Sequence, residues 1–139
     1  MDELPFIATS LENDLRTAGP RFSVAITPVP DVVDEGRRHA GAMGLEVPQP
    51  VDQAIQLSVD GHPEMWLVFF RDRALPEELA DLLYQAQDVV METTTEMWPG
   101  CPFHDHYLRP EPGAEWVAWT CPRSGDSIAR FGQLGSQTV

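Results

Sequence analysis

The chain has 139 residues, of which 42% are apolar and 9% aromatic. It can therefore build one hydrophobic core but is too short for two domains of the usual size, about 100 to 200 residues each. Nine arginines and no lysine stand against 22 acidic residues, which gives a net charge of −13. Because this charge repels polyphosphate backbones and anionic headgroups, we expect neither nucleic acid nor a membrane as a partner.

The beginning of the chain and its hydropathy indicate a cytoplasmic protein. The start Met1-Asp2-Glu3 lacks the basic and apolar regions of a signal peptide. No apolar run approaches the roughly 18 residues of a membrane-spanning helix. We therefore expect the chain to work in a reducing compartment.

The first third of the chain predicts a helix, a strand and a second helix. An apolar stripe with helical spacing predicts a helix over about residues 3–18, stopped by Gly19-Pro20. Alternating apolar residues predict a half-buried strand over 22–26. Asp31 is expected to cap a second helix that runs to Met43, with Gly44 at its C-terminal cap.

The middle third predicts a hairpin and a long helix. Residues 55–59 alternate, the turn is expected at Asp60-Gly61-His62-Pro63, and the return strand is Met65 to Phe70. Both faces of that return strand are apolar, which predicts a central strand covered on both sides. A helix is expected from Pro76, with an apolar stripe that reaches Met97.

This order of elements predicts an α+β fold, with a small antiparallel or mixed sheet packed with helices and a β-rich C-terminal part. We divide the chain into an acidic body over residues 1–97 and a short β-hairpin appendix over 98–134 that packs on the body. The two parts are expected to form one structural domain overall, followed by a loose tail over 135–139.

The chemistry of the chain is concentrated in this appendix. Both cysteines and two of the four histidines lie there, in the runs Cys101-Pro102-Phe103-His104-Asp105-His106 and Cys121-Pro122-Arg123-Ser124-Gly125. Zinc prefers four nitrogen or sulfur ligands at the corners of a tetrahedron, and two tight turns brought together by a hairpin supply them.

This arrangement resembles a zinc ribbon, whose knuckles read Cys-Pro-x-Cys and Cys-Pro-x-Cys-Gly. The resemblance covers about a quarter of the chain: Cys101 and Cys121 match the leading ligands, and His104 replaces the second cysteine. Ser124 occupies the fourth ligand position, where a serine hydroxyl is a poor ligand. His106 is the substitute, because in an extended strand it points to the same face as His104. The predicted metal ligands of a structural zinc ion are therefore Cys101, His104, His106 and Cys121.

Other interpretations of these residues stay open. The knuckles could persist without metal, packed by aromatic side chains, or the grouping could be chance. A Cys101–Cys121 disulfide is a further alternative, although a reducing compartment disfavours it. The run from His104 to His106 also resembles the hairpin of ββα-metal nucleases, but no further histidine follows and the only asparagine is Asn13.

The functional prediction follows from a closed four-ligand site, which leaves no position for a substrate. We predict a small acidic module that binds another protein, as an adaptor, an immunity or inhibitor protein, or an assembly component. The alternative is a metal-dependent hydrolase with three protein ligands, a metal-bound water and Asp105 or Glu115 as the base. Phosphate-binding loops, nucleophile elbows and His-Glu-x-x-His motifs are absent from the sequence.

Overall fold

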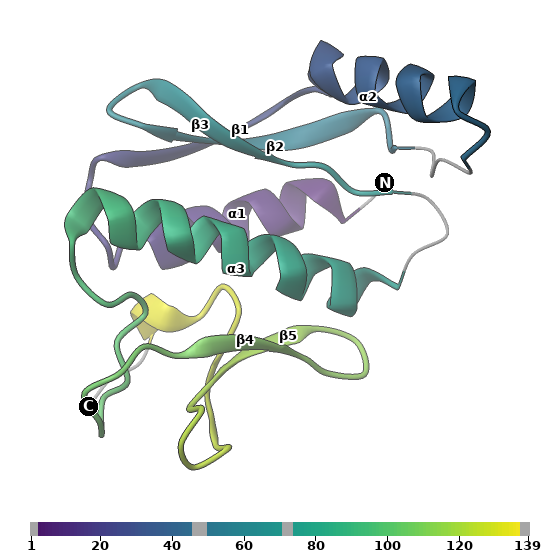
Figure 1. Ribbon diagram of the computed structural model, residues 1–139. Helices are drawn as coiled ribbons and strands as arrows, with labels where there is room; N and C mark the ends of the chain where they lie inside the picture. Colours follow the sequence, from purple (N-terminus) through teal and green to yellow (C-terminus); the bar gives the residue numbers. More distant parts are fainter. Residues whose placement is uncertain (1–2, 46–49, 71–73, 137–139) are drawn as a thin grey trace.

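The computed structural model describes residues 3–45, 50–70 and 74–136, and it confirms the predicted α+β fold (Figure 1). The helices are α1 (Leu4–Leu15), α2 (Asp31–Ala42), α3 (Leu75–Thr94) and the 3-10 turn η1 (Leu134–Ser136). The strands are β1 (Phe22–Pro28), β2 (Gln53–Val59), β3 (His62–Leu67), β4 (Arg109–Pro112), β5 (Val117–Thr120) and β6 (Ser127–Arg130).

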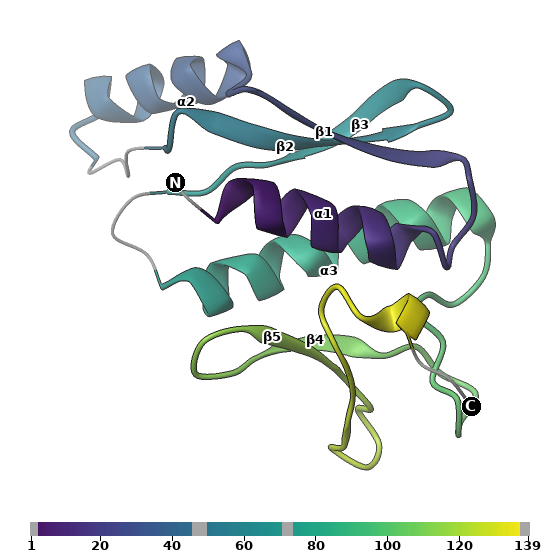
Figure 2. The same ribbon diagram turned by 180° about the vertical axis from the view of Figure 1, so that it is seen from behind.

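Two antiparallel sheets enclose a layer of helices. The upper sheet has the order β1-β2-β3 and the lower sheet the order β4-β5-β6. Helices α1 and α3 lie side by side between the two sheets, while α2 lies on the outer side of the upper sheet (Figures 1 and 2). The buried apolar side chains of both sheets and of the middle helices belong to one continuous core.

The register of the upper sheet explains why its inner face is buried. Val24 pairs with Leu57, and Ile55 pairs with Leu67, so apolar residues of all three strands share the face above α1 and α3. The hairpin turn has only two residues, Asp60 and Gly61, both with positive φ. Such a turn matches the natural twist of the strands it joins. His62 and Pro63, predicted in the turn, begin β3 instead.

The prediction that the return strand is central was wrong, because β2 is the middle strand and β3 lies at an edge. The apolar residues on the two faces of this strand are buried to different degrees. Leu67 and Phe69 point into the core and are fully buried, whereas Trp66 and Val68 on the other face are only partly covered. In this protein, therefore, the strand with apolar residues on both faces is an edge strand that has one buried face and one partly covered face.

Two helix boundaries differ from the predicted ones. Asp31 is the first residue of α2 and not its cap, since Pro30 holds the cap position with extended backbone and no side-chain hydrogen bond. Gly44 does end this helix: its φ is 79° and the Leu45 amide donates to the Ala40 carbonyl. Helix α3 ends at Thr94, so Met97 lies beyond it and is exposed, outside the predicted stripe.

No helix in the described part of the chain has both the length and the apolar character needed to cross a lipid bilayer. Of the loose tail predicted over 135–139, Gly135 and Ser136 belong to η1, and residues 137–139 lie outside the described residues.

Candidate metal centre

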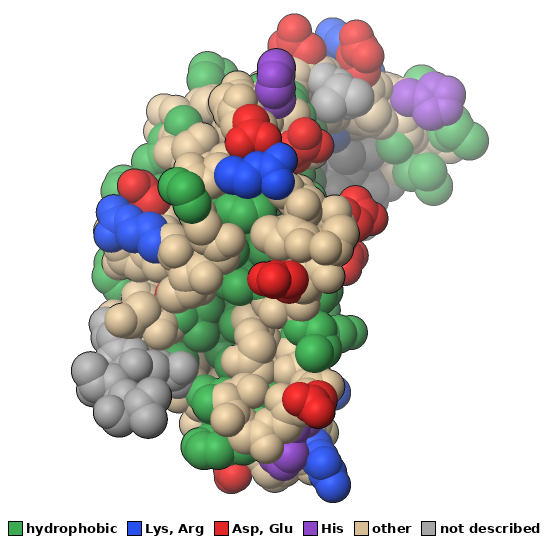
Figure 3. Space-filling model, turned by 90° about the vertical axis from the view of Figure 1, so that its left-hand side faces the viewer, with side chains coloured by type: hydrophobic (Ala, Val, Ile, Leu, Met, Phe, Trp, Pro, Cys, Tyr) green, Lys and Arg blue, Asp and Glu red, His purple; other side chains and the backbone are tan. Residues whose placement is uncertain are grey.

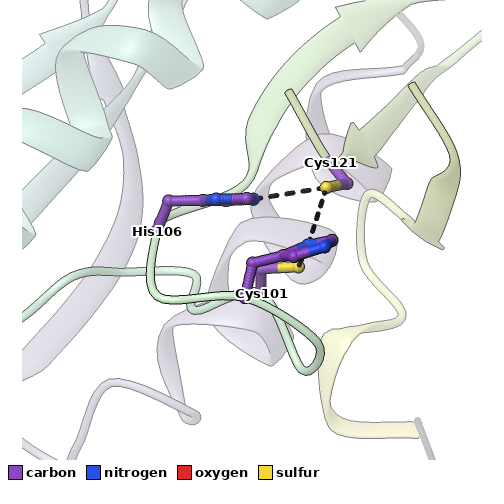
Figure 4. A group of neighbouring side chains, drawn as sticks. Cys101, His106 and Cys121 are labelled. Atoms are coloured by element: carbon purple, nitrogen blue, oxygen red, sulfur yellow. Dashed lines mark hydrogen bonds between the residues drawn. The ribbon is translucent and has the colours of Figure 1, made fainter. Parts of the chain in front are cut away.

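The structure brings the four predicted ligands together at one end of the lower sheet. The ligand atoms of Cys101, His104, His106 and Cys121 all lie within 4.8 Å of one another. Figure 4 shows the His106 ring and the Cys121 sulfur pointing toward each other, with Cys101 on the neighbouring turn. The two thiols are buried and the two imidazoles are half-buried. This group could therefore hold a metal ion.

The first turn of the site carries three of these residues. The Cys101 amide donates to the His106 carbonyl over 2.9 Å, and Gly100 and Tyr107 form a bridge just outside this contact. Residues 102–106 form a series of bends, so the prediction that His104 and His106 share an extended strand was wrong. Both rings still reach the cluster, because the closed turn stacks them with centroids 4.9 Å apart.

The second turn joins β5 to β6 and carries Cys121. The Cys121 amide donates to the Asp126 carbonyl, and the Gly125 amide donates back to the Cys121 carbonyl, each over 2.8 Å. Gly125 has a φ of 77°, which a residue with a side chain rarely adopts. This tight turn also directs the Ser124 amide toward the Cys121 sulfur, at 3.5 Å.

Three of the six distances between ligand atoms are close to those around a tetrahedral ion. The Cys121 sulfur lies 3.2 Å from His106 Nε2 and 3.4 Å from His104 Nδ1, and the Cys101 sulfur lies 3.5 Å from His104 Nδ1. Zinc bonds of about 2.0 Å to nitrogen and 2.3 Å to sulfur set the edges of a ligand tetrahedron at about 3.3–3.8 Å. The three contacts already have this spacing, and the ligand atoms that lie up to 4.8 Å apart would have to approach by about 1 Å to share one ion.

The electrostatics of the site favour a thiolate at Cys121. Burial by itself would raise the pKa of this thiol, but the hydroxyl and amide of Ser124, the His106 ring and the Arg123 backbone all form hydrogen bonds with the sulfur. These bonds outweigh burial and lower the pKa of Cys121 from 9.0 to about 5. Because the thiolate is the form that binds metals, the second turn prepares this sulfur to act as a ligand at neutral pH.

The structure also places the residues of the other interpretations. Ser124 is exposed and its hydroxyl accepts a bond from the Asp126 amide. Asp105 is exposed in the first turn, and Glu115 lies in the turn between β4 and β5, at the opposite end of β5 from Cys121. Neither carboxylate belongs to the cluster. Both cysteines are free, so the alternative of a disulfide is not realised.

Asp14 of α1, which we did not predict as important, anchors the lower sheet, β4-β5-β6. This carboxylate is fully buried and accepts bonds from the Trp119 indole at 2.8 Å and from the Gly132 and Leu134 amides at 2.8 and 3.0 Å. Burial raises the pKa of Asp14, and the three hydrogen bonds only partly oppose that shift. Gly132 has no room for a side chain, because a Cβ there would lie 2.8 Å from the Ser10 hydroxyl.

Gln87 of α3 holds the base of the first turn in a similar way. Its buried amide donates to the carbonyls of Trp98 and Leu108, on the two segments that lead into and out of the turn. The sequence could have marked Asp14 and Gln87 as buried polar residues, since each lies within a largely apolar helical stripe, but it could not have named their partners. Both tie the candidate metal centre to the helices above it.

No protein-family model, curated protein or solved structure matches the chain.

Proposed function

We propose that one structural zinc ion binds Cys101, His104, His106 and Cys121, and that the chain acts by binding another protein. The observation that carries the zinc proposal is the packing of four ligand atoms within 4.8 Å of one another, with three of the distances between them at 3.2–3.5 Å. Two thiols and two imidazoles form a ligand set that suits zinc, and four protein ligands fill its preferred coordination. The strands of the lower sheet have only four residues each, so a bound metal would stabilise the two turns at their ends.

We expect zinc to bind at about one ion per chain and to depend on the cluster. Protein purified without added metal should contain zinc by elemental analysis, whereas Cys121→Ser should lose it. His106→Ala should weaken binding, and His62→Ala is the matched control, because His62 is exposed on β3, outside the cluster. In Cys121→Ser, hydrogen exchange should accelerate over residues 98–134, while α3 and the upper sheet stay protected.

A wild-type protein with less than about 0.2 zinc per chain and a protected C-terminal sheet would contradict this proposal. The two turns would then be held by hydrogen bonds and aromatic packing alone. Another metal at full occupancy would keep the site and change only the identity of its ion.

The proposal of a protein partner is supported by apolar side chains exposed beside the site. Phe103, within the first turn, is 75% exposed, and Tyr107 and Met97 flank the same turn and are also exposed. Exposed aromatic and methionine side chains are enriched where proteins bind one another. Basic side chains do not gather on the face drawn in Figure 3, where the blue groups lie among red ones within the coloured residues. The coloured part of that face offers no basic surface to a nucleic acid.

We expect a partner protein to bind at the first turn. The partner is first enriched on the immobilised, metal-loaded chain. Phe103→Asp should lose at least about nine-tenths of the bound partner, since burying an unpaired charge costs several kcal/mol. Met43→Asp is the control, because Met43 is 66% exposed and directly follows α2, which lies at the opposite end of the molecule in Figure 1. Equal recovery with both variants, at unchanged zinc content, would place the binding surface elsewhere.

A further inference from the structure

The two edges of the upper sheet differ in how they are protected against pairing with another strand. At the β3 edge, Pro63 has no amide hydrogen to donate and Glu64 carries an exposed charge. A bulge between Leu57 and Ser58 also interrupts the register of β2 with β3. Proline, charge and bulges are the features by which sheet proteins block their edges.

The β1 edge has none of these features over most of its length. Its register with β2 is unbroken from Phe22 to Pro28, and no charged residue occurs from 22 to 30. Ser23 and Ala25 are exposed, as is Ile26, at 37%. Within the described residues, β1 pairs only with β2, and Figure 2 shows α1 below the sheet and α2 above it. A long, uncharged, regular edge of this kind is a template for another strand.

We propose that β1 pairs in antiparallel fashion with β1 of a second copy of this chain, which joins the two upper sheets into one sheet of six strands. The two-fold axis passes through Ala25. This pairing does not involve the metal site.

The sequence of β1 argues for a second copy as the occupant, because its central segment Ser23-Val24-Ala25-Ile26-Thr27 is chemically symmetric about Ala25. Antiparallel pairing around that residue places Ser23 opposite Thr27 of the second copy, and Val24 opposite Ile26. Each β-branched side chain then meets another on the inner face, and each hydroxyl meets another on the outer face. Such cross-strand pairs stabilise a sheet, and no like charges face one another. A two-fold axis needs a surface that is complementary to itself in this way.

The charge of the chain predicts how this dimer responds to salt. Two copies with a net charge of −13 each repel one another, whereas the contact itself contains no charged residue. Because salt screens repulsion between exposed charges and leaves backbone pairing almost unchanged, we expect the dimer to become tighter as ionic strength rises.

Sedimentation velocity on the full chain tests the proposal with two matched double variants. Wild type should sediment at twice the 15.5 kDa of one chain at micromolar concentration. S23K/T27K places lysine opposite lysine at two positions of the dimer and should weaken dimerisation about tenfold or more. S23K/T27E changes the same two positions but places opposite charges across the axis, so it should remain a dimer. Circular dichroism and zinc content should be unchanged in both variants.

A wild type that remains monomeric at submillimolar concentration would overturn the proposal and leave the edge to a strand of a different protein. A dimer that persists in S23K/T27K, or one that loosens as salt rises, would also overturn it, since the contact would then lie on another, charged surface. Loss of zinc with an intact dimer would bear only on the metal centre.

Discussion

Asp14→Ala is expected to lower the free energy of unfolding by about 3–5 kcal/mol. The substitution leaves three buried donors without an acceptor, the Trp119 indole and the Gly132 and Leu134 amides. Each unsatisfied buried donor costs about 1–3 kcal/mol, and the contributions are not fully additive because the donors share one acceptor. Urea denaturation followed by tryptophan fluorescence measures the change.

Asn13→Ala is the matched control for this experiment. Asn13 is the neighbour of Asp14 on α1, and its side chain accepts a hydrogen bond from the exposed Arg16. We expect a change within about 0.5 kcal/mol there. A loss of less than about 1 kcal/mol in Asp14→Ala would show that water replaces the carboxylate and that Asp14 does not anchor the C-terminal sheet.

Leu67→Asp should lower the free energy of unfolding by a similar or larger amount, on the order of 4 kcal/mol or more. Leu67 is fully buried on β3 opposite Ile55, so the new carboxylate would have to lose its hydration without a partner or be protonated. Although β3 is an edge strand, Leu67 on its inner face is as fully buried as Leu57 of the central strand β2. Chemical denaturation checks the loss, and Leu67→Ala, expected to cost about 2–5 kcal/mol, covers the case in which Leu67→Asp does not fold.

His62→Asp serves as the control on the same strand. His62 is exposed at the start of β3, where a carboxylate stays hydrated, so the midpoint should hardly move. An unchanged midpoint in Leu67→Asp would contradict the position of this strand above α1 and α3.

Local signals in the sequence predicted elements whose cause is itself local. The apolar stripes of α1 and α3 report a helical period, and the pair Asp60-Gly61 can adopt the positive φ values of a two-residue turn. The approach of Cys101 and Cys121 also follows from short-range geometry, since two tight turns at the same end of one small sheet place their ligands together. Resemblance to zinc-ribbon spacing was therefore enough to find the cluster.

Other features could not be predicted because they depend on partners distant in the chain. The central position of β2 results from β1 pairing on its free side, and the sequence of β2 and β3 alone carries no information about that choice. Asp14 meets Trp119 and Leu134 across more than 100 residues, so its role as an anchor appears only after folding.

The sequence by itself thus determined the helices, the hairpin, the α+β class and the identity of the four clustered side chains, because periodicity, turn chemistry and ligand spacing act over a few residues. Only the tertiary structure decided the strand order, the enclosure of α1 and α3 between two sheets, and the links from Asp14 and Gln87 to the metal-centre end. These arrangements minimise exposed apolar surface and unpaired buried polar groups for the whole chain at once, and that balance is not encoded in any single segment.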